Sequence, residues 1–130
     1  MAVLRAMGLR HVDSIILLSH RIDVTVAFYR KIGLPVITEQ HGPDDEPHFA
    51  LDFGDVHFGF IEATPEIGLK RGQGGAVQFG FTIDDVEETY QLALDAGAKA
   101  VIASQNLPFG RRAVVEDPDG RPIQFKQPPR

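Results

Sequence analysis

Apolar residues recur along the chain with two different periods, and these periods predict two helices set among strands. In residues 23–33 the apolar positions follow helical spacing: Val24, Ala27, Phe28 and Ile32. We expect this helix to begin at Asp23, because Asp is a favoured N-cap, and to end at Gly33, a common helix terminator. Pro35 then prevents the helix from continuing.

A second helix is predicted to open at residues 84–87, whose sequence is DDVE, and to close at Gly97. An Asp at the cap followed by Glu three residues later resembles a capping box, and the acidic residues suit the positive end of the helix dipole. The apolar positions Val86, Tyr90 and Leu94 again follow helical spacing.

The remaining apolar segments alternate with period two or lie between turn residues, which is typical of strands. We predict strands at residues 13–19, 36–40, 48–53, 56–62, 76–83, 99–104, 112–116 and 122–126. The order strand–helix–three strands therefore occurs twice, in modules of about residues 10–64 and 75–127 on either side of a junction at residues 73–75. The predicted fold class is α+β, with two βαβββ modules in a single domain of residues 1–130.

A tight turn of type II′ at Gly54-Asp55 would fix the pairing of the strands on either side of it. In that register Asp52 lies opposite His57 and Ala50 lies opposite Gly59 on one face, while Phe residues occupy the other face. An Asp beside a His could act as an acid–base pair. The alternative is a solvated cross-strand pair near the hairpin tip, and we favour that alternative.

Composition and charge exclude several classes of function. The chain has a formal net charge of −5 without a basic stripe, so we expect no nucleic-acid partner. It has no apolar run long enough to cross a membrane and no basic segment followed by an apolar stretch at its start, so we expect neither a membrane partner nor a secretory signal. Cysteine is absent, which rules out disulfides and thiolate chemistry and is compatible with the cytoplasmic location that we expect.

Three segments resemble one known family. Residues 23–34, with the sequence DVTVAFYRKIGL, are similar to its D-x5-F-Y-x3-G-(L/F) helix. Residues 116–125, EDPDGRPIQF, resemble its D-P-D-G-x-x-(I/L)-E-(L/F) ending, and residues 83–86, IDDV, resemble the opening of its second helix. The chain thus resembles the vicinal oxygen chelate superfamily, which comprises glyoxalases, extradiol dioxygenases, fosfomycin-modifying enzymes and bleomycin-binding proteins.

The resemblance implies a curled mixed sheet that forms a cup, and in the metal enzymes of the superfamily four ligands come from the first and last strand of each module. The positions here that correspond by spacing are Ser14, Gly59, Gln78 and Gln124. None of them is His, Asp or Glu, so they would hold a divalent metal poorly. We therefore expect no cofactor and no metal ligand among the four.

A weaker alternative keeps a metal. His57 lies two residues before Gly59 on the same predicted face and could combine with Gln78 and Gln124. The protein would then be a metal-dependent lyase, isomerase or dioxygenase with atypical ligands. The catalytic residues of such an enzyme are unknown, and His57 and Asp52 are the candidates.

The favoured hypothesis is metal-independent binding of a small molecule in the cup, as in the bleomycin-binding branch, where a homodimer sequesters an antibiotic. The predicted ligand-binding residues are Ser14, His57, Gly59, Gln78, Gln124 and Arg112. A guanidinium at Arg111 or Arg112 could hold an anionic group, although an exposed charged pair at a strand edge is the favoured interpretation. The acidic segment 41–48, with His at both ends, could hold a cation, but its composition favours a solvated loop.

Overall fold

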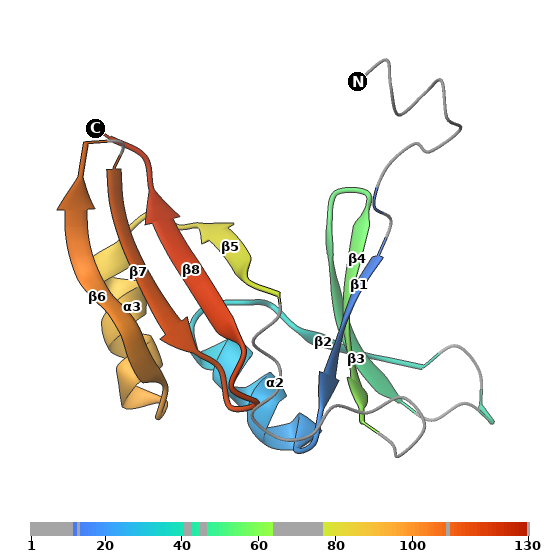
Figure 1. Ribbon diagram of the computed structural model, residues 1–130. Coiled ribbons are helices and arrows are strands. Elements are labelled where there is room, and N and C mark those ends of the chain that lie inside the picture. Colours follow the sequence, from blue (N-terminus) through green and yellow to red (C-terminus); the bar gives the residue numbers. More distant parts are fainter. Residues whose placement is uncertain are drawn as a thin grey trace.

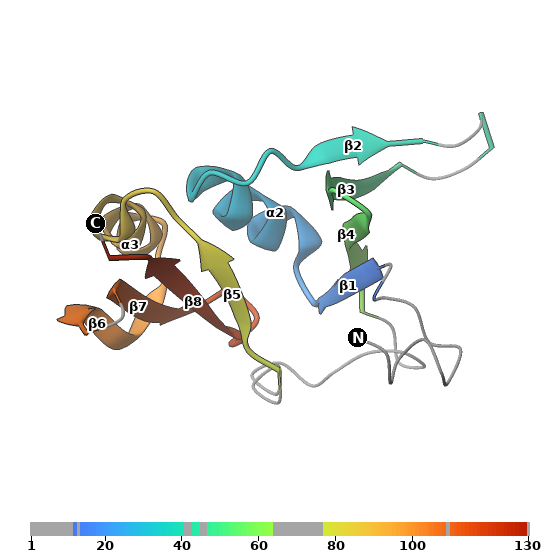
Figure 2. The same ribbon diagram turned by 90° about the horizontal axis from the view of Figure 1, so that it is seen from above.

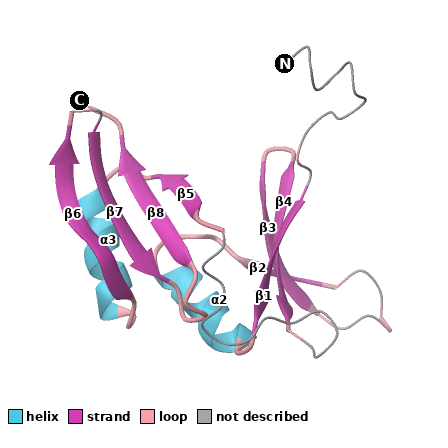
Figure 3. Cartoon of the chain, viewed as in Figure 1, coloured by secondary structure: helices cyan, strands magenta, loops and turns pink. Residues whose placement is uncertain are grey.

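Two four-stranded sheets and two helices make up the part of the chain that the structure describes (Figure 1). The computed structural model describes residues 12, 14–40, 43–44, 47–63, 77–108 and 110–129. The elements follow the predicted order, strand–helix–three strands, in each half (Figure 3). The predicted Gly-rich junction at residues 73–75 lies outside the described residues.

The first sheet has the strand order β1-β4-β3-β2. Its strands are β1 (Ser14–Ser19), β2 (Ile37–Glu39), β3 (His48–Phe53) and β4 (Val56–Glu62). β1 runs parallel to β4, and the other neighbours are antiparallel. The predicted bounds of β3 and β4 are confirmed, and Asp13, the first residue of the predicted β1, lies outside the described residues.

The second sheet repeats this arrangement with the order β5-β8-β7-β6. Its strands are β5 (Phe79–Thr82), β6 (Lys99–Leu107), β7 (Gly110–Glu116) and β8 (Pro122–Gln127). β5 runs parallel to β8, while β7 pairs antiparallel with both β6 and β8. The internal repeat predicted from the order of elements is therefore present in the sheet topology as well.

Helix α2 (Ile22–Lys31) begins two residues earlier than expected, whereas helix α3 (Val86–Asp95) begins as predicted. In α3 the side chain of the N-cap Asp85 accepts a hydrogen bond from the backbone N–H of Glu88 at 3.1 Å. In α2 the N-cap is Arg21, whose side chain makes no capping bond, so the expected N-cap at Asp23 is wrong. Asp23 lies in the first turn, where its charge still favours the helix dipole.

The first residue of each helix is capped from the end of the last strand of its own module. The backbone N–H of Ile22 donates to a carboxylate oxygen of Glu62, the last residue of β4, at 3.3 Å. The backbone N–H of Val86 donates to the side-chain carbonyl of Gln127, the last residue of β8, at 2.9 Å. These equivalent contacts satisfy helix N–H groups that have no partner within the helix.

Both halves contribute to one hydrophobic core, and this arrangement corrects the expected cup. Helix α2 lies between the two sheets (Figure 2), and Phe58 of β4 packs against Phe79 and Phe81 of β5 with ring centroids 5.9 and 6.1 Å apart. The sheets are two separate layers joined through their apolar faces, not one curled sheet. The opposite face of the first sheet is consequently turned away from the second sheet, so the described strands of one chain enclose no cup between the sheets.

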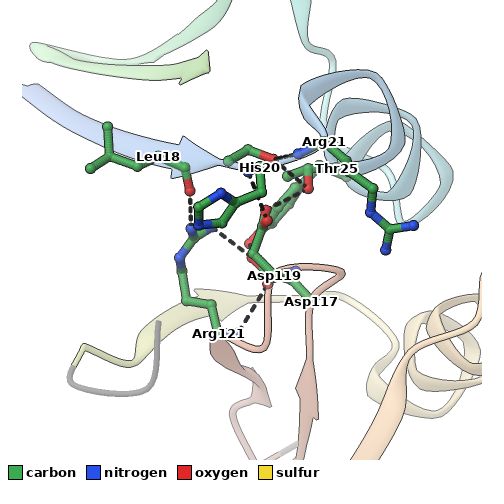
Figure 4. A network of polar contacts seen from close by, with 9 residues as sticks. Leu18, His20, Arg21, Thr25, Asp117, Asp119 and Arg121 are labelled. Atoms are coloured by element: carbon green, nitrogen blue, oxygen red, sulfur yellow. Dashed lines mark hydrogen bonds and ion pairs between the residues drawn. The ribbon is translucent and has the colours of Figure 1, made fainter. Parts of the chain in front are cut away.

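A buried polar network fastens the turn between β7 and β8 to the first half of the chain (Figure 4). Asp117 accepts hydrogen bonds from the hydroxyl of Tyr29 and from the guanidinium of Arg121, both at 2.7 Å. Asp119 accepts from the hydroxyl of Thr25 at 2.6 Å and from the backbone N–H of His20 at 3.1 Å. The two carboxylates of the D-P-D-G turn are therefore structural, and they hold β1 and α2 against the second sheet.

Neither described helix has the length and apolar character needed to span a membrane.

Candidate functional site

The open face of the first sheet, which is the face away from helix α2, carries most of the predicted site residues. Backbone pairing places Ser14 beside His57, Ile16 beside Gly59, and Ala50 beside Gly59 from the other side. These residues share a face because side chains of paired positions point to the same side of a sheet. A side chain at Gly59 would begin 2.9 Å from the tip of Ile16, so the Ile16 side chain lies close over the glycine and covers part of this face.

The predicted Asp52–His57 pair is present on the same face. The β3–β4 register is the expected one, and Gly54 has a positive φ of 58° while Asp55 does not, as the type II′ turn requires. The Nδ1 atom of His57 lies 2.8 Å from a carboxylate oxygen of Asp52. The carboxylate of Asp52 therefore orients the imidazole, and the Nε2 atom of the ring points toward β2 and Glu39.

The structure adds two residues that the sequence analysis did not assign to the site, Glu39 and His48. The Nε2 atom of His48 lies 3.1 Å from a carboxylate oxygen of Glu39, and the Nε2 atom of His57 lies 3.9 Å from the same oxygen. All three side chains are partly buried, with exposed fractions of 20% for Glu39, 31% for His48 and 38% for His57. For His48 the sequence does contain a signal, because alternation along β3 places it on the same face as Asp52.

The predicted residues of the second module lie on the open face of the second sheet. Gln124 pairs with Gly80, and a side chain at Gly80 would begin 3.6 Å from the amide nitrogen of Gln124. Gln78 directly precedes β5 and is exposed. Arg112 and Lys126 are paired on the same face as Gln124. The alternative ligand set of His57 with Gln78 and Gln124 therefore draws on the outer faces of two different sheets, and no described contact joins its two parts.

The two neighbouring arginines have different surroundings. The guanidinium of Arg111 donates to Ser104 at 2.8 Å, to Asn106 at 2.9 Å and to Glu87 at 2.9 Å, and these contacts tie β7 to β6 and helix α3. In Arg112 the Nε atom is buried without a hydrogen-bond partner among the residues that the structure describes. Of the two, Arg112 is therefore the one whose donor capacity remains for a ligand.

A hollow of about 440 Å³ lies elsewhere, between the start of α2, the α3–β6 turn and the β7–β8 turn. Its lining includes Arg21, Val24, Lys99 and Glu116, and it contains none of the predicted site residues. The candidate residues instead lie on open sheet faces. The histidines and carboxylates of the first sheet and the amide of Gln124 on the second lie on those faces, away from the hollow.

Comparison with known proteins places this architecture in a family. The model of the "Glyoxalase/Bleomycin resistance protein/Dioxygenase superfamily" matches residues 9–125. No curated protein matches the chain.

Solved structures share the fold at low sequence identity. A hypothetical protein from S. aureus is 16% identical with a TM-score of 0.74, and the match covers 95% of this chain and 98% of that one. A glyoxalase/bleomycin resistance protein/dioxygenase family enzyme from Burkholderia phytofirmans PsJN is 17% identical with a TM-score of 0.71, over 92% and 100% of the two chains. TnmS3, an antibiotic binding protein from Streptomyces sp. CB03234, is 20% identical with a TM-score of 0.65, over 95% and 99%.

Proposed function

The chain belongs to the glyoxalase/bleomycin resistance protein/dioxygenase superfamily, and from this premise we propose that it binds a small organic molecule without a metal at the superfamily's four ligand positions. The observation that carries the proposal is the chemistry of these four positions. Ser14, Gly59, Gln78 and Gln124 offer neither an imidazole nor a carboxylate, whereas divalent first-row metals are held by such groups. Small residues lie among or beside these positions: Ser14 and Gly59 on the first sheet, and Gly80 beside Gln124 on the second.

The surroundings of these positions suit an organic ligand. On the first sheet the exposed apolar side chains of Ile16 and Ile37, 43% and 54% exposed, lie on the same face as Gly59. On the second sheet Gln124 supplies a hydrogen-bond donor next to Gly80, and Arg112 adds one from β7 on the same face. Apolar walls with a few polar groups are typical of small-molecule sites. One solved structure with the same fold is that of an antibiotic binding protein, and this supports antibiotic sequestration as the role.

We further propose a homodimer in which the first sheet of one protomer faces the second sheet of its partner. A single chain turns its two open faces in different directions, so the ligand needs a second copy to be enclosed (Figure 2). Exposed Ile16 and Ile37 would be covered in the same step. The ligand site would then combine Ser14 and Gly59 of one protomer with the region of Gln124 in the other.

Thermal-shift screening with antibiotics and with hydroxy and keto acids, both with and without a chelator, identifies the ligand, because a molecule that binds only the native state raises the melting temperature. Two variants then locate its site. Gly59→Leu and Gly80→Leu each fill one open face, where the added Cβ meets only side-chain atoms at its shortest distance. We expect each variant to lose binding while its melting temperature without ligand stays close to that of the wild type.

Mixing the two variants tests the dimeric site. If the site spans two protomers, a mixed dimer has one site with both substitutions and one site with neither, so part of the binding capacity returns. If mixing restores nothing although exchange of subunits is demonstrated, the site lies within one chain and the dimeric arrangement is wrong. If neither variant affects binding, the open faces are not the site.

A second candidate function is a metal-dependent lyase, isomerase or dioxygenase with atypical ligands. The observation that favours it is the convergence of Glu39, His48 and His57 on one face. Ligand binding that disappears in chelator and returns with a divalent ion would support this second candidate over the first.

A further inference from the structure

Three potential metal ligands from three adjacent strands meet on the open face of the first sheet. Glu39 lies in β2, His48 in β3 and His57 in β4, and one ligand atom from each lies within 4.8 Å of the other two. None of the three occupies a position that corresponds to a superfamily metal ligand, since those positions are Ser14, Gly59, Gln78 and Gln124. The cluster is therefore a separate feature of this chain.

The sheet register explains how these side chains come together. Glu39 and His48 are directly paired across β2 and β3, and their side chains are in contact. His57 lies further along the sheet, paired with Asp52, and its Nε2 atom would lie 3.9 Å from a Cβ at Gly59. The imidazole thus extends over Gly59 toward Glu39. The small residues Gly59 and Ala50 between the two ends of the cluster leave the space that the three side chains share.

Two of the three ligand-atom pairs are spaced close to what one ion requires, and the third pair lies within 4.8 Å. Ligands about 2.0–2.2 Å from a metal lie roughly 3.0–3.5 Å from one another. The Glu39–His48 pair, at 3.1 Å, already meets this, and the Glu39–His57 pair, at 3.9 Å, exceeds it by a few tenths of an ångström. Exposed fractions between 20% and 38% mean that solvent reaches the cluster and can complete the coordination.

Asp52 supplies the outer contact that metal-binding histidines usually have. Its carboxylate lies 2.8 Å from the Nδ1 atom of His57. An Nδ1–H that donates to this carboxylate leaves the lone pair on Nε2, the atom that faces Glu39. Such carboxylate–histidine pairs fix the tautomer and the ring orientation at metal sites.

We propose that Glu39, His48 and His57 bind one first-row divalent metal ion, with Zn²⁺ as the best fit, and that Asp52 positions His57. Two imidazole nitrogens and one carboxylate oxygen are a common ligand set for Zn²⁺ and its neighbours in the first row. Ca²⁺ and Mg²⁺ prefer sites made of oxygen ligands and should bind weakly here. The site does not depend on the proposed small-molecule ligand, because it involves only the chain's own side chains.

Metal titration of chelator-treated, dialysed protein tests the proposal. We expect one equivalent of Co²⁺ per chain to produce a visible absorption band, and Zn²⁺ but not Mg²⁺ to abolish it. A competing chromogenic chelator gives the Zn²⁺ affinity. His48→Ala and His57→Ala should each weaken Zn²⁺ binding at least tenfold, and Asp52→Asn, which keeps all three ligands, should weaken it about tenfold.

Matched variants keep the result interpretable. His20→Ala removes an exposed imidazole outside the cluster and should leave the Zn²⁺ affinity unchanged. Glu39→Gln is nearly isosteric, so its loss of affinity cannot be attributed to misfolding if its melting temperature matches that of the wild type. The proposal is wrong if Co²⁺ gives no saturable band, or if His48→Ala and His57→Ala bind Zn²⁺ as tightly as His20→Ala does.

Discussion

The hydroxyl of Tyr29 donates a hydrogen bond to a carboxylate oxygen of Asp117 at 2.7 Å, although the two residues belong to different halves of the chain. Both side chains are inaccessible, with exposed fractions of 0% and 4%. Tyr29 lies on helix α2 and Asp117 directly follows β7, so this bond joins the two modules inside their shared core. A buried hydrogen bond to a charged group contributes more than one to a neutral group.

Tyr29→Phe removes this hydroxyl and little volume. We expect the variant to lose about 1.5–3 kcal/mol of unfolding free energy near neutral pH, because the Asp117 carboxylate loses one of its partners without gaining water. Urea denaturation measures the change. Tyr90→Phe is the control on helix α3, and a loss there equal to that of Tyr29→Phe would contradict the special role of the inter-module bond.

The same pair predicts a dependence on alkaline pH. Burial, together with the negative charge of Asp117, holds the pKa of Tyr29 well above its ordinary value of 10.0, and Arg121 opposes this only in part. The unfolded chain therefore releases this proton first, so stability is complete below pH 10 and is lost as the pH rises beyond it. Compared with the Tyr29→Phe variant, the wild type should lose about 1.4 kcal/mol of unfolding free energy for each pH unit above 10.

Denaturation of both proteins at pH 9 and at pH 11 checks this. The other titrating groups are common to the two proteins, so their contributions cancel in the difference. A difference in unfolding free energy that stays constant between the two pH values would mean that Tyr29 ionises normally in the folded state.

The second inter-module bond, from Thr25 to Asp119, gives an independent prediction. Thr25→Val keeps the shape of the side chain but removes the hydroxyl that donates to Asp119 and accepts from Ser19 at 3.0 Å. We expect a loss of about 1–3 kcal/mol, since two buried polar groups lose a partner. Thr38→Val, at an exposed position of β2, should change the stability by less than about 0.5 kcal/mol. Equal effects of the two substitutions in thermal denaturation would refute the prediction.

Local signals in the sequence predicted the elements and one register. The Gly54-Asp55 turn fixes the β3–β4 pairing because it is short, and Asp85 caps α3 because its partner is three residues away. The start of α2 was missed for the opposite reason. Its first N–H is satisfied by Glu62, 40 residues later, and no local pattern reports a contact of that kind.

The arrangement of the two sheets, and the presence of Glu39 in the site, also depend on contacts between residues that are far apart in the sequence. The two sheets pack against each other through contacts such as those of Phe58 with Phe79 and Phe81. Period-two alternation does not predict these contacts, because it is the same for one curled sheet and for two separate sheets. Glu39 was missed because the β2–β3 connection carries no short turn to set its register. His57, Gly59 and Gln124 lie on the strand faces that alternation predicts for them, since alternation alone decides the face.

Two glycines with positive φ allow backbone strain to be separated from steric collision. Gly33, at φ 111°, closes helix α2, and a Cβ there would meet nothing within 4 Å. Gly110, at φ 128°, opens β7, and a Cβ there would collide with the backbone carbonyl of Gln127 in β8. Gly33→Ala should therefore cost only the strain of the backbone conformation, about 1–2 kcal/mol.

Gly110→Ala adds the collision to a similar strain, and relief of that collision requires β7 and β8 to separate at the end of the second sheet. We expect it to cost at least about 2 kcal/mol more than Gly33→Ala, because two backbones cannot give way as a flexible side chain can. Urea denaturation of the two variants measures the difference, and hydrogen exchange at Arg111 and Gln127 locates it. If both variants lose the same free energy, the close approach of β7 and β8 at Gly110 does not contribute to stability.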